Sequence, residues 1–155
     1  MFELQFKNQL INFHCLLHQE NLCCKKIDLD SVHEKVFDTI IILKKPGNFH
    51  KDFRKFLQAE EADFSDVVYF SEIRWLSRAN CLKRFFELLE NINKFFIEKD
   101  QQINEFSNIF WKIKLAFVVD ITTLLNQLNI SIQGKNKFIL DSFEQIKKFK
   151  CKLTN

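Results

Sequence analysis

Glycine and proline are almost absent from this chain. Its 155 residues include two glycines, Gly47 and Gly134, and a single proline, Pro46. Average usage would be about 7% glycine and about 5% proline. Sandwiches and barrels connect many short strands through turns rich in these residues, so their scarcity excludes the all-β classes. Two isolated glycines also cannot form a glycine-rich phosphate loop or a dinucleotide-binding fingerprint, which excludes the commonest nucleotide-binding motifs.

The chain also lacks a strong charge imbalance and a long apolar run, and its number of cysteines is odd. The net charge is +3 at pH 7, which does not by itself indicate a nucleic-acid partner. The apolar run that begins at Leu115 ends at Asp120, so we expect no membrane-spanning segment and no membrane partner. Glu3 and Lys7 interrupt the apolar N-terminus, so we expect no signal peptide and a reducing compartment. There the five cysteines are expected to stay free thiols.

Helical periodicity is the main pattern that the sequence does have. Residues 1–18 are ambiguous, because their spacing fits a short strand and the start of a helix equally well. A first helix is predicted at about residues 31–45, capped by Asp30 or Ser31 and ended by the proline and glycine that follow. Its apolar face is formed by Val32, Val36, Ile40 and Leu43.

The same periodicity predicts further helices along the rest of the chain. Asn48 is expected to cap the second of them, and residues 64–76 are expected to form a loop or a short strand. The approximate ranges of the remaining helices are 48–63, 82–96, 107–132 and 139–152. We therefore predict one all-α domain over residues 1–155, an antiparallel bundle of four to six helices with at most one short N-terminal strand.

Cysteine and histidine gather near the N-terminus. Cys15 and His18 have the C-x-x-H spacing that can present two zinc ligands from one turn, and Cys23 and Cys24 follow. The second pair follows too closely for the usual structural zinc site, in which a dozen or more residues separate the pairs. We therefore predict no metal site and no cofactor, and interpret the cysteines as small buried side chains. Zinc binding by Cys15, His18 and Cys23 stays an open alternative.

The segment from residue 72 to 78 has two interpretations. In the first, Trp75 and Leu76 anchor the segment in the core, Ser77 caps the next helix, and Arg74 and Arg78 are solvated. In the second, Trp75 stacks on a base while Arg74 and Arg78 contact phosphate. Composition alone favours the first interpretation.

Charged residues elsewhere give weaker signals. The last predicted helix ends in a basic turn, in which nucleic-acid contact would need a second basic patch nearby. Its lysines are Lys147, Lys148, Lys150 and Lys152. The aspartates that could hold a catalytic metal are scattered along the chain rather than grouped. They are Asp28, Asp30, Asp120 and Asp141.

Five blocks of the sequence, taken in order, resemble hAT-type transposase-derived proteins. The blocks are residues 14–23, 72–78, 82–88, 115–122 and 128–136. The resemblance is greatest to the domesticated members, namely general transcription factor II-I repeat domain-containing, zinc finger BED domain-containing and SCAN domain-containing proteins. It extends from about His14 to Leu153. In that family a ribonuclease-H-like fold with catalytic acidic residues is split by a large α-helical insertion.

The resemblance implies which part of such a protein this chain is. Cys15 and His18 occupy the C-x-x-H motif at the start of the insertion. Trp75, with Arg74 beside it, occupies the position that handles the DNA end. The strands that carry the catalytic acidic residues are not matched, so the chain is similar to the helical insertion alone. We therefore expect no catalytic residues and no enzymatic activity, because cleavage needs a set of carboxylates that holds metal ions.

Two functional readings follow from the resemblance. In the first, the chain is a catalytically inactive helical module that contacts protein or DNA in the nucleus; without the resemblance we would expect the cytoplasm. DNA binding is then expected to be weak and non-specific, through Arg74, Trp75 and Arg78. Self-association is expected through apolar surface left exposed where a catalytic core would pack. In the second reading, the chain is a truncated gene product or partial gene model with no independent function.

Overall fold

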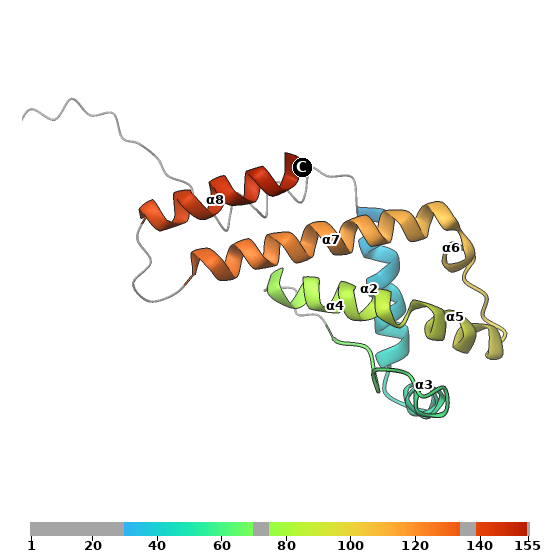
Figure 1. Ribbon diagram of the computed structural model, residues 1–155. Coiled ribbons are helices and arrows are strands. Elements are labelled where there is room, and N and C mark those ends of the chain that lie inside the picture. The colour runs from blue at the N-terminus through green and yellow to red at the C-terminus, as the bar shows by residue number, and fades with distance from the viewer. Residues whose placement is uncertain (1–29, 70–74, 134–138, 155) are drawn as a thin grey trace, which may run out of the picture.

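The computed structural model describes residues 30–69, 75–133 and 139–154, and every regular element within these ranges is a helix (Figure 1). Within these ranges there is no strand. The helices are α2 (Asp30–Lys44), α3 (Asn48–Ala59), α4 (Trp75–Glu87), α5 (Leu89–Glu98), α6 (Asn104–Ser107), α7 (Ile109–Ile132) and α8 (Ile139–Thr154). The all-α class is thus confirmed for this part of the chain. The expected four to six helices are too few, since seven occur here, and the ambiguous residues 1–18 lie outside the described ranges.

Three of the helices run side by side in alternating directions. The long helix α7 contacts both α4 and α8 and runs opposite to each of them (Figure 1). In contrast, α2 crosses α7 steeply, and α3 lies below and contacts α2 and α5. The Pro46–Gly47 turn and the irregular residues 60–69 redirect the chain between these elements. The predicted antiparallel bundle is therefore wrong as a description of all the helices.

The apolar face of α2 lies in the core as its spacing predicts. Its four members, which recur at steps of four, four and three, are all buried. They are Val32, Val36, Ile40 and Leu43. Two buried residues of α3, Phe53 and Leu57, complete this side of the core.

Phenylalanine rings form the centre of the core. Phe95 of α5 is buried and makes edge-to-face contacts with Phe49 and Phe53 of α3, with ring centroids 5.2 and 5.1 Å apart. A third ring of α3, Phe56, lies 5.5 Å from it. Such pairs stabilise a core beyond the area that they bury, by about 0.5–1.5 kcal/mol each. Phe95 is therefore the main link between α3 and α5.

The helix predicted at residues 82–96 begins earlier and is interrupted. It starts at Trp75, and a turn at Leu88 divides it into α4 and α5. The amide of Leu88 still donates to the carbonyl of Arg84, and the carbonyl of Leu88 accepts from the amide of Ile92. The hydrogen-bond pattern of a helix thus continues through the turn. Because Leu88 and Leu89 are both buried, apolar spacing alone could not reveal the break.

Two other helix starts also differ from prediction. Gly47, not Asn48, occupies the N-cap position of α3, with φ of 140°, a backbone conformation that favours glycine. At α7 the side chain of Asn108 accepts hydrogen bonds from the amides of Phe110 and Trp111, at 2.9 and 3.3 Å. This cap fixes the start of α7 after Asn108 rather than at Ser107, because it satisfies amides that have no partner within the helix.

Helix α7 is long and apolar enough, by length and composition alone, to cross a membrane. The sequence shows no uninterrupted apolar run of that length, because Asp120 interrupts the apolar residues of this helix. In the structure Leu115 and Val118 of α7 are buried in the shared core, and the helix contacts α4, α6 and α8. A core helix of a helical domain passes the same test of length and composition. We therefore continue to interpret α7 as a packing helix.

Candidate functional site

Of the predicted DNA-contacting residues, the structure describes the side chain of Arg78 alone. Arg74 lies outside the described ranges, and Trp75 is described as the first residue of α4 without its side chain. Ser77, which one interpretation made the helix cap, is instead the third residue of α4. The guanidinium of Arg78 is 5.7 Å from the centre of the Phe37 ring on α2. Arg78 is thus partly engaged with the protein, and the site itself stays a prediction.

The C-x-x-H motif and its neighbours cannot be placed. Cys15, His18 and Cys23 all lie outside the described ranges. Among the residues that the structure does describe, no group of three or more histidine, cysteine or acidic side chains could hold a metal ion. His33 stacks on the ring of Phe37, and His50 contacts Asp66. Zinc binding at the N-terminus therefore stays an open alternative.

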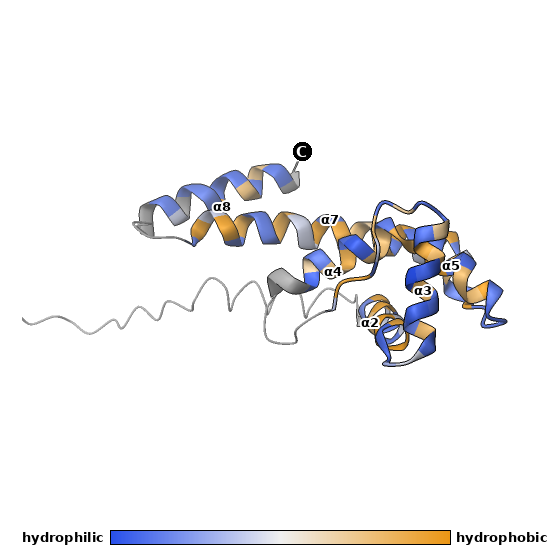
Figure 2. Cartoon of the chain, turned by 90° about the horizontal axis from the view of Figure 1, so that it is seen from below, coloured by the Kyte–Doolittle hydropathy of each residue, from blue (hydrophilic) through white to orange (hydrophobic). Residues whose placement is uncertain are grey.

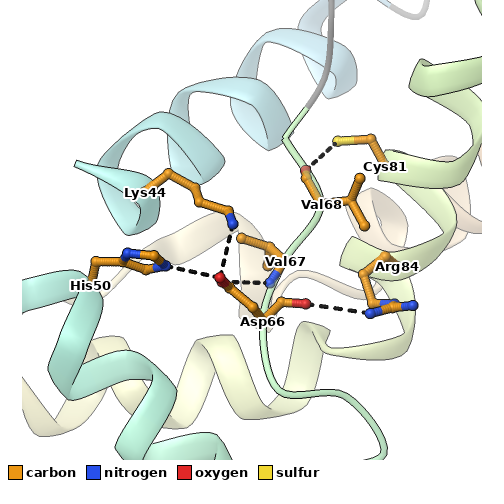
Figure 3. A network of polar contacts seen from close by, with 7 residues as sticks. All are labelled: Lys44, His50, Asp66, Val67, Val68, Cys81 and Arg84. Carbon is orange, nitrogen blue, oxygen red and sulfur yellow. Dashed lines mark hydrogen bonds and ion pairs between the residues drawn. The ribbon is translucent and has the colours of Figure 1, made fainter. Parts of the chain in front are cut away.

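Asp66 joins α2, α3 and the segment that leads into α4 (Figure 3). Its Oδ2 accepts hydrogen bonds from Lys44 Nζ at 2.8 Å and from His50 Nε2 at 2.9 Å. Its Oδ1 accepts from the backbone amide of Val67 at 2.8 Å. Burial raises the pKa of the Asp66 carboxyl, but the hydrogen bonds and charges of Lys44 and His50 outweigh burial, and the pKa is lowered. The carboxylate is therefore held in its ionised form.

Two side chains of α4 extend this junction. Arg84 donates from Nη1 to the carbonyl oxygen of Asp66 at 3.5 Å, and its guanidinium lies 3.4 Å from the centre of the Phe64 ring. Cys81 donates from Sγ to the carbonyl oxygen of Val68 at 3.2 Å (Figure 3). Burial raises the pKa of the Cys81 thiol to about 12, so this thiol stays protonated and is a poor nucleophile. The junction is thus structural in its chemistry.

A groove lies beside the junction, between α3 and the segment at residues 61–65. Its volume is about 660 Å³. One wall comes from α3, and three of its exposed side chains are cationic: Lys51, Arg54 and Lys55. None of the three forms an ion pair with any described residue, whereas Lys35, Lys44, Lys94, Lys99 and Lys112 all do. The groove therefore has a wall of uncompensated positive charge.

The N-terminal half of α7 exposes a row of large apolar side chains. We call Ile109, Phe110, Ile113 and Phe117 the α7 apolar face; each is between 50% and 74% exposed. Their spacing places them on one side of the helix. Contiguous apolar surface of this kind marks interaction sites more often than chance exposure does. In Figure 2 the ribbon of α7 is coloured hydrophobic over several turns, with hydrophilic residues between them.

The lysine-rich end of α8 is a separate basic surface. Lys147, Lys148 and Lys152 are exposed. Lys148 and Lys152 line a small hollow of about 140 Å³ between α7 and α8, together with Phe149. In Figure 1, α8 lies on the opposite side of the molecule from α3, so the basic groove and this surface do not form one patch.

Sequence reasoning missed the groove and the Asp66 junction. The signal for the basic wall is present, since Lys51, Arg54 and Lys55 recur at steps of three and one along α3. Nothing in the local pattern indicates that Asp66 returns to the ends of α2 and α3. That contact joins residues 16 and 22 positions apart.

Comparisons with known proteins cover nearly the whole chain. Residues 14–154 match the FAM200/GTF2IRD2 helical domain. General transcription factor II-I repeat domain-containing protein 2 of Bos taurus is 35% identical over 139 residues, which are 90% of this chain and 15% of that protein. The protein of the same name from Mus musculus is 33% identical over 144 residues, 93% of this chain and 15% of that protein. No solved structure matches.

Proposed function

Because this chain belongs to the FAM200/GTF2IRD2-like helical domain family, we propose that it is a catalytically inactive helical module of a domesticated hAT-type transposase. Its role is to contact protein surfaces in the nucleus, including that of a second copy of the same chain. The relatives' names, which describe transcription-factor repeat proteins, support a nuclear location. The match to a small part of much longer relatives supports a module that works by contact.

The observation that carries this proposal is the α7 apolar face. A side chain the size of leucine or phenylalanine contributes about 1.5–3 kcal/mol when it is fully removed from water. Burying four such side chains in one row therefore contributes free energy of the same order as the entropic cost of association. A lipid surface is less suitable, because Lys112 and Lys114 lie within the same two turns. Another protein surface can cover the apolar row while the lysines remain in water.

We expect that replacing Ile113 and Phe117 by glutamine weakens self-association of the 155-residue chain at least about tenfold, because two large apolar contacts are lost. Glutamine is a good helix former, so α7 itself should persist. Sedimentation velocity over a range of protein concentrations measures the dissociation constant directly.

A matched control replaces Ile41 and Ile42 of α2 by glutamine. These side chains are 49% and 44% exposed but lie on another helix. The control is expected to associate like the wild type. A wild-type chain that stays monomeric at high concentration, or two variants that behave alike, would contradict the assignment of the α7 apolar face.

DNA contact is the second candidate function, favoured by the position of Arg78 on the first turns of α4, just after Trp75. We expect weak, salt-sensitive and sequence-independent binding, with Trp75 stacking on bases and the arginines contacting phosphate. Fluorescence anisotropy with a labelled duplex, at several salt concentrations, measures both affinity and salt dependence. Replacing Arg74 and Trp75 together by alanine is expected to weaken binding several-fold and to reduce the salt slope by about one. Equal binding by the wild type and the double variant would remove this site.

The remaining alternative is a truncated gene product with no independent function. It differs from the proposal in one measurable property, which is cooperative unfolding of the isolated chain. A chain that lacks part of its core would keep helical signal without a cooperative transition.

A further inference from the structure

The basic groove between α3 and residues 61–65 has no part in the function proposed above, which rests on α7. We propose that this groove binds a peptide segment of another protein that carries an anionic side chain next to an apolar one. The anion would lie against α3, and the apolar side chain would lie on the floor of the groove.

Positive charge on α3 is the first argument. Lys51, Arg54 and Lys55 are exposed within five consecutive residues, and none pairs with a described carboxylate. The acidic residue between them, Asp52, accepts a hydrogen bond from Lys99 at 3.1 Å and so compensates a different charge. Figure 2 shows the outer side of α3 as hydrophilic. An arginine flanked by lysines is a common way to bind a carboxylate or a phosphate group.

An apolar floor is the second argument. Ala62 and Phe64, which are both partly exposed, line the groove together with the cationic side chains. Arg84 covers one side of the Phe64 ring and holds it in place. The volume of about 660 Å³ falls within the range of 300–1,000 Å³ that is typical of ligand sites. A free inorganic anion would leave such a floor unused, whereas a peptide side chain would cover it.

The opposite side of the groove distinguishes a peptide from a nucleic acid. The exposed side chain of Glu61 lines this side. A continuous phosphate backbone that followed the groove would pass the Glu61 carboxylate and be repelled by it. A peptide carries a single anion to α3, and its backbone amides can donate to Glu61. The modest net charge of +3 also favours a ligand with few negative charges.

Backbone contacts hold the two walls of the groove together. The amide of Ala62 donates to the carbonyl of Leu57 at 3.0 Å, and the amide of Glu61 donates to the carbonyl of Gln58 at 3.3 Å. His50, at the start of the cationic wall, is fixed by its contact with Asp66. The groove is thus formed before a ligand arrives, so little ordering is needed on binding.

Fluorescence anisotropy with labelled peptides tests the proposal. The probes are a twelve-residue peptide with phosphoserine between two leucines, and the same peptide with aspartate or with unmodified serine. The phosphoserine or the aspartate peptide is expected to bind the 155-residue chain at least about tenfold more tightly than the serine peptide. Tighter binding of phosphoserine assigns a phosphorylated partner, and equal binding of both anionic peptides assigns an acidic one.

Two charge variants locate the binding site. Replacing Arg54 and Lys55 by glutamine is expected to reduce binding of the better peptide at least about tenfold. Replacing Lys147 and Lys148 of α8 by glutamine removes the same charge elsewhere and should leave binding unchanged. All four side chains are exposed, so both variants should keep the wild-type melting temperature.

Three results would overturn the proposal. The first is no difference between the anionic peptides and the serine peptide. The second is equal loss of binding in both charge variants, which would indicate general electrostatic attraction. The third is that a labelled oligothymidine binds the chain more tightly than the anionic peptides do. To count, the oligothymidine must also displace the peptides, and its binding must weaken when Arg54 and Lys55 are replaced by glutamine. That result would assign the groove to nucleic acid instead.

Discussion

Replacing Phe95 by alanine is expected to lower the free energy of unfolding by about 3–5 kcal/mol, the usual cost of removing a buried phenylalanine. Phe95 is 1% exposed and contacts rings of Phe49, Phe53 and Phe56, so the substitution leaves a cavity between α3 and α5. Domains of this kind are stable by about 5–15 kcal/mol, so the loss is a large fraction of the total. Urea denaturation followed by circular dichroism measures it.

The control is Phe86→Ala on α4, which removes the same atoms from a side chain that is 39% exposed. Its cost should be about 1 kcal/mol or less, because little buried surface is lost. Similar losses in the two variants would contradict the position of Phe95 at the centre of the core. A wild-type chain without a cooperative transition would favour the truncated gene product over an autonomous module.

Asp66→Asn is expected to lower the free energy of unfolding by about 1–2 kcal/mol at pH 7, because Lys44 and His50 lose a charged partner that is only partly exposed to solvent. The pKa of Asp66 in the folded chain is below its usual value of 3.8. The stabilisation is therefore fully present above about pH 4 and is lost as the pH falls through the lowered pKa. The difference between wild type and variant should then shrink towards zero in acid.

The measurement is urea denaturation of both proteins at several pH values between 7 and the acid limit of folding. Comparing the two proteins at each pH removes the contribution of other carboxylates, such as Glu105, whose pKa the hydrogen bond from Lys35 lowers. Asp52→Asn, which breaks an exposed pair with Lys99, is the matched control and should cost a few tenths of a kcal/mol. A difference at Asp66 that is the same in acid as at neutral pH would show that shape, not charge, causes it.

Sequence patterns predicted the helices whose apolar spacing is regular. The buried face of α2 is an example, because residues that recur every three or four positions must share a side of any helix that they form. The stop at Pro46 and Gly47 was equally accessible, since each residue has a local backbone preference. The all-α class follows from the same local rules.

Features that depend on tertiary packing were not predictable. The turn at Leu88 keeps helical hydrogen bonds and lies between two buried leucines, so it leaves no trace in the apolar pattern. The steep crossing of α2 over α7 joins helices that are far apart in the sequence, and the apolar spacing of each helix does not set it. The number of residues that connect two helices does not by itself set the crossing angle between them.

In the candidate sites, too, local features were predictable and features that depend on tertiary packing were not. Arg78 was singled out from a local motif, and the structure adds its contact with Phe37 on another helix. The groove depends on the return of residues 61–65 to α3, which Asp66 secures through Lys44 and His50. The sequence shows the positive charges on α3. It does not show whether these charges form ion pairs in the folded chain.

The exposed row on α7 also has a consequence for the amount of this chain in a cell. Chaperones and proteases recognise uncovered hydrophobic surface, and they retain or degrade proteins that display it. If the α7 apolar face binds a protein partner as proposed, a copy whose Phe110 and Phe117 stay in water is exposed to this surveillance, and a bound copy is shielded. The abundance of the chain would then follow the supply of the partner rather than its own rate of synthesis.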